Sequence, residues 1–291
     1  MSVRRLAGRG ASADEAPRHA YDPRIAAFLE DIYSACNVEG RLSRDPLAVV
    51  KRYADPADRE VAALVCSTLA FGSVDLIVRA CESALAPLGA RPATALARMR
   101  ASGLSSAWSA FRYRFCSPED MAALMRGIKR AREERGSLEA LFLAGDQGGP
   151  DVVDALGEFV HALKALGAAP TRKGGTPRAI RENLLPEPAR GSACKRLFLF
   201  LRWLARSDDV DPGGWEAVDR SRLVVPLDLH MTRVCCGRLG FIPRERADLR
   251  NALMATEAFR LYSPEDPVKY DFALTRPGID PARGDERFGC A

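Results

Sequence analysis

The sequence has no long apolar run. No stretch approaches the roughly 20 apolar residues that cross a bilayer. Residues 1–20 carry arginines but lack the apolar segment of about 7–15 residues that a secretory signal needs. We therefore expect a disordered tail at residues 1–22 and a second tail, rich in Gly and Pro, at residues 281–291. The expected setting is the cytoplasm, without a membrane partner.

Patterns of metal ligands are also missing. The 291 residues include eight cysteines and three histidines, and no two cysteines stand in a C-x₂-C pair. Zinc and iron–sulfur sites need clustered ligands of this kind. The sequence therefore predicts no metal and no cofactor, and its scattered cysteines are typical of free thiols in a reducing compartment.

Strand patterns are absent as well, because alternation of apolar and polar residues never persists beyond a few positions. Apolar residues instead recur at the three- and four-residue spacing of amphipathic helices. Helices are predicted after Pro23, Asp45-Pro46, Asp55-Pro56, Ser73, Pro92 and Ser117, over Val152–Leu166 and Ala247–Leu261, and from Ser263 through Leu274. The chain is predicted to be all-α.

Positive charge is concentrated in one region. Residues 171–250 hold 16 Lys and Arg against 10 Asp and Glu, whereas the other residues hold 27 against 28. A local basic field of this kind favours a polyanion such as nucleic acid. A solvated face in an arginine-rich protein would give the same excess, and charge alone does not separate the two interpretations.

One segment in this region, Val224–Val234, joins a buried-looking run to the start of a helix. Asp228 follows Pro226 and opens an amphipathic segment that runs to Leu239 and stops at Gly240. Asp is a favoured N-cap, and the helix dipole favours its negative charge. A simple helix cap is one interpretation, and a catalytic carboxylate is the other.

A second segment, Gly191–Arg206, predicts a helix whose apolar face holds Leu197, Phe200, Leu201 and Leu204. Lys195, Arg202 and Arg206 form a basic stripe opposite, which we expect to be the part that escapes burial. Lys195 lies in the first turn, where the dipole disfavours a cation and so favours the neutral amine of a nucleophile. A solvated lysine is the alternative.

A flexible basic loop precedes that helix. It contains Arg172 and Lys173 beside two glycines, Gly174 and Gly175, and Pro186 and Pro188 stiffen its exit. Backbone amides in such a loop can approach phosphates. A plain linker accounts for the same composition.

These segments resemble the helix-hairpin-helix DNA glycosylases. Pro226–Val234 is similar to their catalytic aspartate segment, and Glu60–Leu69 is similar to the early helix beside their lesion pocket. The lysine that opens a helix 33 residues before the aspartate is closest to the archaeal 8-oxoguanine glycosylase branch. Over residues 22–280 the chain also resembles a bacterial family that carries the motifs Cys194–Trp203, Pro226–His230 and Asp266–Leu274.

Three features depart from the glycosylase pattern. No Leu-Pro-Gly-Val-Gly hairpin exists, and Gly191–Lys195 stands in its place. Leu229 occupies a position where Thr is common, so a hydroxyl that would support the aspartate is missing there. The iron–sulfur cysteine spacing of the endonuclease III branch is absent too.

The resemblance implies a two-lobed helical fold with a cleft between the lobes. The central lobe would span residues 60–190, and residues 23–59 with 191–280 would form the second lobe, which carries the lysine and the aspartate. It further implies double-stranded DNA with a damaged base as the partner, and a bacterial, nucleoid-associated setting. The oligomeric state is not readable from the sequence.

The implied chemistry is base excision, with 8-oxoguanine as one candidate base. Lys195 would attack C1′ of the sugar and form a Schiff base that permits strand cleavage, while Asp228 would deprotonate the amine and stabilise charge on the sugar. Stacking on the extruded base is assigned to Phe71, Phe198 and Trp203. Contacts with DNA are assigned to Arg172, Lys173, Arg190, Arg202, His230 and Arg233.

Two other functions remain open at this stage. One is a DNA-binding protein of the same fold without glycosylase activity. The other is an all-α protein with a role in RNA processing or as a scaffold. The distance between the Lys195 amine and the Asp228 carboxylate, and a cleft between them, distinguish the catalytic alternative.

Overall fold

The computed structural model describes residues 19–169 and 180–279, and helices dominate them. Apart from helices and turns, these residues form only isolated β-bridges, which confirms the all-α prediction. None of the helices described is both long and apolar enough to cross a membrane. The α-helices are α1 (Pro23–Cys36), α2 (Leu47–Val50), α3 (Pro56–Thr68), α4 (Val74–Leu85), α5 (Pro92–Arg98), α6 (Ala101–Ala107), α7 (Pro118–Arg135), α8 (Leu138–Gly145), α9 (Val153–Gly167), α10 (Lys195–Ala205), α11 (Leu229–Arg233), α12 (Leu249–Arg260) and α13 (Asp271–Ile279).

Six of the described α-helices, namely α1, α3, α7, α8, α11 and α12, begin after a residue whose side chain caps them. The Asp55 side chain accepts the amide hydrogens of Ala57 and Asp58 at the start of α3. Ser117 and Asp120 form a reciprocal capping box on α7. Each cap satisfies amides that the first helical turn leaves free, so the start of the helix is fixed locally.

The last helix begins later than the sequence predicts. Ser263-Pro264-Glu265-Asp266 has the composition of a capped helix start, yet residues 263–270 form turns, and α13 begins at Asp271. The reason is Pro267, which has no amide hydrogen and disfavours helical geometry at Asp266. The delay places Asp271 in the first turn of α13.

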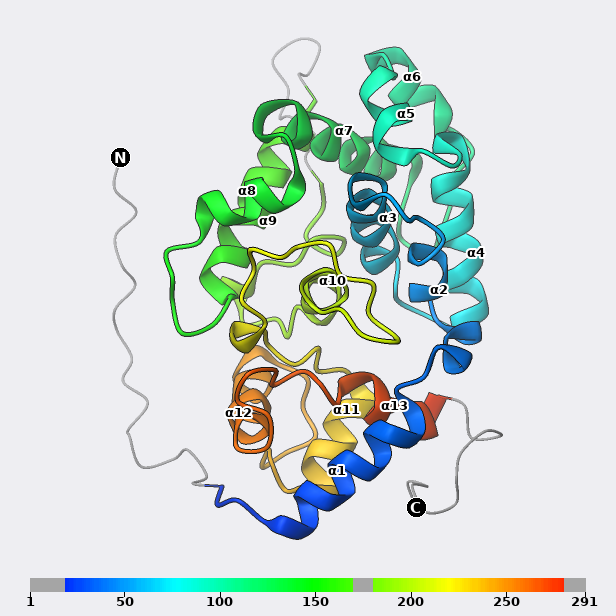
Figure 1. Ribbon diagram of the computed structural model, residues 1–291. Coiled ribbons are helices and arrows are strands. Elements are labelled where there is room, and N and C mark those ends of the chain that lie inside the picture. The colour runs from blue at the N-terminus through cyan, green and yellow to red at the C-terminus, as the bar shows by residue number, and fades with distance from the viewer. Residues whose placement is uncertain (1–18, 170–179, 280–291) are drawn as a thin grey trace.

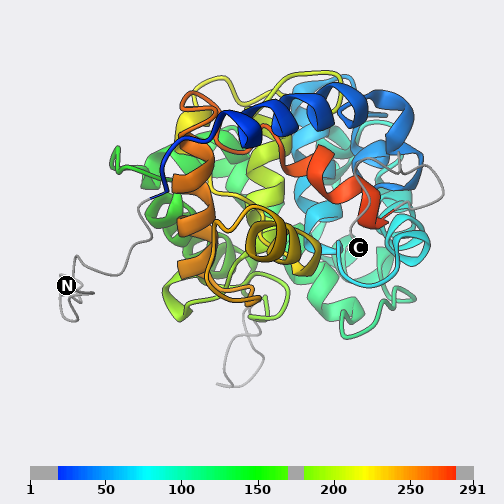
Figure 2. The same ribbon diagram turned by 90° about the horizontal axis from the view of Figure 1, so that it is seen from below.

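Helix α10 lies in the middle of the molecule, as Figure 1 shows in a view along its axis. It packs against α3 on one side. On another side Phe200 stacks on Phe159 of α9, with ring centroids 6.0 Å apart. Helix α1 packs along α13, and Figure 2 shows the two beside each other at one face.

The division into two lobes stays a prediction. Its boundary between residues 59 and 60 falls inside α3, which is one continuous helix. Buried apolar residues from α1 through α13 also form a single contiguous core. The cavity described below therefore opens among helices that share that core.

The predicted disordered tail, residues 1–22, is too long at its C-terminal end, because residues 19–22 pack on the helical body. His19 donates from Nε2 to the carbonyl oxygen of Phe241 at 3.1 Å, and the two rings lie 5.5 Å apart. The amide of Asp22 donates to Tyr262. Aromatic contact with the segment around α12 holds these residues, while residues 1–18 and the predicted tail at 281–291 lie outside the described residues.

Buried ion pairs hold the C-terminal half of α10. Arg202 pairs with Asp211 at 3.0 Å and with Asp271, and both carboxylates are almost wholly buried. Arg206, also buried, pairs with Asp211 and with Asp266. Burial alone would lower the pKa of Arg206, but the carboxylates around it raise that pKa above its ordinary value. These contacts tie α10 to the loop that follows it and to the start of α13.

Asp208 extends this network to α1. Its carboxylate accepts hydrogen bonds from Tyr33, Asn37, Arg206 and the amides of Val210 and Asp211. Although burial opposes ionisation, Arg206 and the two amides hold the pKa of Asp208 below its ordinary value. Burial and the neighbouring Asp208 raise the pKa of Tyr33 to about 12. Helix α1 is thereby fixed against the end of α10.

Substitution of Asp211 by Asn should lower the free energy of unfolding by about 3–5 kcal/mol, because it leaves two buried guanidinium groups short of a counter-charge. Urea denaturation at neutral pH measures the loss. Glu82→Gln is the matched control, since its pair with Arg52 is largely exposed. That control should cost about 1 kcal/mol or less. Equal effects of the two changes would contradict the central role of the buried pairs.

The lowered pKa of Asp208 predicts a loss of stability in acid. Its contribution is fully present above the ordinary Asp pKa of about 3.9 and is lost as the pH falls towards the lower folded pKa. Asp208→Asn should therefore be less stable at pH 7 and should show a shallower fall in stability below about pH 4. Urea midpoints measured from pH 7 to pH 2.5 test this. An unchanged acid slope would mean that other carboxylates carry the effect.

Candidate functional site

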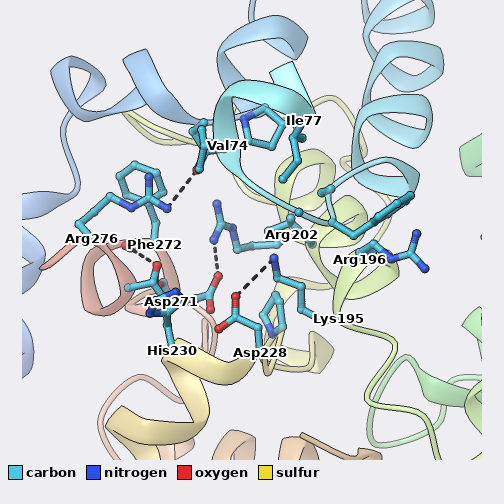
Figure 3. A pocket seen from close by; sticks show the side chains of 18 residues that line it. Val74, Ile77, Lys195, Arg196, Arg202, Asp228, His230, Asp271, Phe272 and Arg276 are labelled. Carbon is cyan, nitrogen blue, oxygen red and sulfur yellow. Dashed lines mark hydrogen bonds and ion pairs between the residues drawn. The ribbon is translucent and has the colours of Figure 1, made fainter. Parts of the chain in front are cut away.

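A cavity of about 420 Å³ lies at the N-terminal ends of α10, α11 and α13. Its lining also includes Phe71 and Gly72, between α3 and α4, and Val74, the first residue of α4. The volume falls in the range of about 300–1,000 Å³ that small-molecule sites occupy. Figure 3 shows that Lys195 and Asp228 point towards each other within it.

Lys195 is the first residue of α10, and the chain before it takes an unusual path. Cys194 has the left-handed conformation, with φ of 44°, which non-glycine residues rarely adopt. Gly191 is left-handed too, and its carbonyl accepts the amide of Leu249 at 3.2 Å, which anchors this turn to the start of α12. The turn therefore sets where Lys195 begins the helix.

Asp228 caps α11 as the sequence predicts. Its backbone is extended, and its Oδ1 accepts the amide hydrogen of Met231 at 2.9 Å. The buried run before it is held by the Val225 amide, which donates to Thr256 of α12 at 3.0 Å. The Thr232 hydroxyl donates to the Asp228 backbone carbonyl, so a hydroxyl supports this residue from the next turn although Leu229 has none.

The second carboxylate oxygen of Asp228 meets the lysine. Lys195 Nζ lies 3.4 Å from Asp228 Oδ2, and about a quarter to a third of each side chain is exposed. Because Oδ1 is engaged by the helix cap, Oδ2 has a fixed direction. The pair is thus oriented, reachable from the cavity and close enough to exchange a proton.

Phe71 lines the cavity, as predicted for a residue of the base pocket. The two side chains that contact its ring, Phe115 and Arg196, were not predicted to belong to the site. Its ring stacks on Phe115, with centroids 4.3 Å apart and planes 10° apart, and the Arg196 guanidinium lies 5.0 Å from its centroid. Arg196 donates to the carbonyl oxygens of Thr68 and Asn183, and burial lowers its pKa to about 10. The position of Arg196 directly after Lys195 in the sequence could have identified it as a residue of the site.

Three assigned residues are not available to DNA. Phe198 and Trp203 are almost wholly buried and belong to the apolar core, so their assignment to the base pocket is wrong. Arg202 reaches the inner end of the cavity, yet its guanidinium is committed to Asp211 and Asp271. The predicted exposed stripe is wrong for both Arg202 and Arg206, because carboxylates from distant segments allow both to be buried.

The other DNA-binding assignments are spread out. His230 lines the cavity beside Asp228. Arg233 is exposed, one turn further along the helical segment, which continues into a π-helical turn at Val234–Arg238. Arg190 is exposed and lies 3.5 Å from Glu187. Arg172 and Lys173 lie outside the described residues.

The cavity also contains three charged residues to which the sequence analysis gave no site role. Asp271 pairs with Arg202, while Arg276 pairs with Asp45 at 3.0 Å. They were missed for two reasons. Asp45, before Pro46, has the pattern of a helix-capping residue, and α13 was expected to begin before Asp271. No group of three or more potential metal ligands occurs among residues 19–169 and 180–279. Guanidinium groups and carboxylates of the lining instead form ion pairs, Arg202 with Asp271 and Arg276 with Asp45.

The two roles of Asp228 predict separable effects. Asp228→Ala removes the cap and should cost about 1 kcal/mol of unfolding free energy, whereas Asp228→Asn should keep most of it, because Asn caps helices nearly as well as Asp. Thermal or urea denaturation of both variants measures the difference. If Asp228→Asn were as unstable as Asp228→Ala, the ion pair with Lys195 rather than the cap would hold α11.

Of the comparisons with known proteins, only the one with family models gives a match. No curated protein matches it, and no solved structure does. One family model matches residues 45–280, which is most of the chain and includes Lys195, Asp228 and the cavity. The chain therefore belongs to the family described as "Protein of unknown function (DUF2400)".

Proposed function

We propose that this protein is a DNA glycosylase with abasic-site lyase activity, in which Lys195 is the nucleophile and Asp228 its proton acceptor. The observation that carries the proposal is the 3.4 Å approach of Lys195 Nζ to Asp228 Oδ2 at a cavity of about 420 Å³. Two catalytic groups held by two helix ends in a reachable cavity are the arrangement that covalent catalysis needs. The resemblance to helix-hairpin-helix glycosylases supports the same reaction.

The residues account for each step. Transfer of one proton from Lys195 to Asp228 leaves a neutral amine, which attacks C1′ of the extruded nucleotide. The new C1′–N bond forms as the bond to the base breaks, and the base leaves with the electron pair and takes up a proton. Loss of a proton from the lysine nitrogen, with opening of the C1′–O4′ bond and protonation of O4′, gives the Schiff base.

Charge near the pair suits a phosphate backbone. Lys195 and Arg196 line one side of the cavity, where Lys195 pairs with Asp228. Arg196 is held by backbone carbonyls and not by a carboxylate among its hydrogen-bond partners in the described chain. Such cations attract the phosphates on either side of an extruded nucleotide.

Apolar side chains near the cavity support contact with bases. Among the described residues, six large hydrophobic side chains are exposed, and three of them adjoin lining residues. Leu76 is next to Ile77, Phe115 stacks on Phe71, and Leu229 lies between Asp228 and His230. Extrusion of a nucleotide costs a few kcal/mol of stacking, which apolar contacts with the neighbouring bases offset in part.

Borohydride trapping on duplexes with an abasic site, 8-oxoguanine or uracil tests the proposal. The wild-type protein should form a covalent adduct, and Lys195→Ala should form none, because the imine nitrogen is lost. Asp228→Asn should slow adduct formation by about 10²–10⁴-fold, the usual worth of a positioned base. Gel analysis of single-turnover reactions measures both.

The matched control is Lys269→Ala, which breaks another lysine–carboxylate pair, with Glu30 at 2.8 Å, outside the cavity lining. It should react like the wild-type protein. An adduct that persists in Lys195→Ala would refute the nucleophile assignment. Duplex binding without an adduct or base release across the lesion panel would refute catalysis and leave a DNA-binding protein.

A further inference from the structure

The cavity has a second polar pair on the side away from Lys195. Arg276 of α13 forms an ion pair with Asp45, which precedes α2, at 3.0 Å. Both residues line the cavity, and Figure 3 shows Arg276 and Phe272 on the side opposite Lys195 and Arg196. The proposed reaction uses neither Asp45 nor Arg276.

This pair is held rigidly. Asp45 Oδ1 accepts the amide hydrogen of Leu47 at 2.9 Å, which leaves Oδ2 for Arg276. The Arg276 guanidinium lies 4.1 Å from the centroid of the Phe272 ring. Fixed orientation is what a hydrogen-bonding surface needs for discrimination, because little freedom is lost when a ligand binds.

Arg276 also has unused hydrogen-bonding capacity. Its side chain is almost wholly buried, yet its Nε has no hydrogen-bond partner within residues 19–169 and 180–279. A buried donor without a partner is unfavourable, so such groups in a cavity point to a ligand that accepts a hydrogen bond.

The balance of charge separates the two sides of the cavity. On the Arg276 side, Asp45 neutralises Arg276. Between the two sides, Asp271 neutralises Arg202. On the other side, Lys195 pairs with Asp228 at 3.4 Å, and Arg196 donates to backbone carbonyls and to no carboxylate among its hydrogen-bond partners in the described chain. An anion such as phosphate is favoured at the Lys195 side, and an uncharged group that both donates and accepts is favoured at the Arg276 side.

We propose that Asp45 and Arg276 determine specificity by binding the edge of an extruded base that presents an N–H group beside a C=O group. The N–H donates to the Asp45 carboxylate, and the carbonyl oxygen accepts from the Arg276 guanidinium. The assignment to an extruded base rests on the proposed glycosylase function. The recognition of this edge stands on the cavity itself.

The pair favours an N–H/C=O edge over the amino/ring-nitrogen edge of adenine or cytosine. Hydrogen bonds to charged groups gain most from an acidic donor and an electron-rich acceptor. A ring N–H beside a carbonyl group is a more acidic donor than an exocyclic amine, and a carbonyl oxygen is a better acceptor for a guanidinium than a ring nitrogen. Hypoxanthine and uracil carry the first edge, and adenine and cytosine carry the second.

Binding of free bases tests this without any reaction. Calorimetric titration of the wild-type protein should show hypoxanthine binding about tenfold more tightly than adenine, and uracil more tightly than cytosine, as expected for one paired hydrogen-bonding edge. Asp45→Asn should remove the preference, because Asn presents both a donor and an acceptor while still capping α2. Arg276→Met, which removes the donor, should weaken hypoxanthine binding with little effect on adenine.

Glu30→Gln is the control for loosening of α13, since Glu30 binds Lys269 and Tyr270, just before that helix and outside the cavity lining. It should keep the wild-type preference. Equal affinity for the two members of each pair, or no binding of any of the four bases, would overturn the proposal. So would an unchanged preference in Asp45→Asn.

Duplex substrates separate this inference from the proposed function. Asp45→Asn should lower excision of hypoxanthine about tenfold yet leave trapping on an abasic site, which has no base to read, within about twofold of wild type. An equal loss in both assays would show that the pair only supports the fold, and would overturn the specificity role. Preference for hypoxanthine in the binding assay, with no adduct on any duplex, would retain this inference and refute the glycosylase.

Discussion

The buried ion pairs of α10 are the constraint on which the candidate site depends. Arg202 and Arg206 are buried in the centre of the molecule, and Asp211, Asp266 and Asp271 neutralise them. Asp271 opens α13, so its bond with Arg202 fixes that helix against α10. Lys195 and Arg202 are two turns apart on the same helix face, so the same contacts fix the direction of the lysine. Loss of either arginine would leave buried carboxylates without a counter-charge.

The reactive pair of the site comes from helix ends. Lys195 begins α10, Asp228 caps α11, and Asp271 begins α13. Backbone amides at these ends are free to cap a carboxylate, as the Met231 amide does for Asp228. The left-handed Cys194 is the strained residue in this arrangement, and strain of this kind is often kept where it places a functional group. In the proposed function, a base would meet one wall that carries the reactive pair and another that carries Asp45 and Arg276.

Local patterns predicted the helices well wherever the deciding atoms lie within one turn. The caps at Asp55, Ser117 and Asp228 depend on hydrogen bonds over two or three residues, and all three are present. The amphipathic pattern failed for Arg202 and Arg206, because a helix taken alone does not show which carboxylates will neutralise its charges. It failed again after Ser263, where a capping pattern outweighed the proline four residues later. Phe198 and Trp203 were misassigned for a similar reason, since aromatic residues fill cores as readily as pockets.

The sequence by itself determined the helical class, the cap at Asp228 and the place of Lys195 at the start of a helix, because each depends on periodicity or on contacts between near neighbours. Only the tertiary structure brought the amine to 3.4 Å from a carboxylate 33 residues away. It alone paired Asp45 with Arg276, near opposite ends of the described chain, and buried two arginines of a stripe that looked exposed. These outcomes depend on how helices pack, and packing is decided by shape and charge summed over many distant residues.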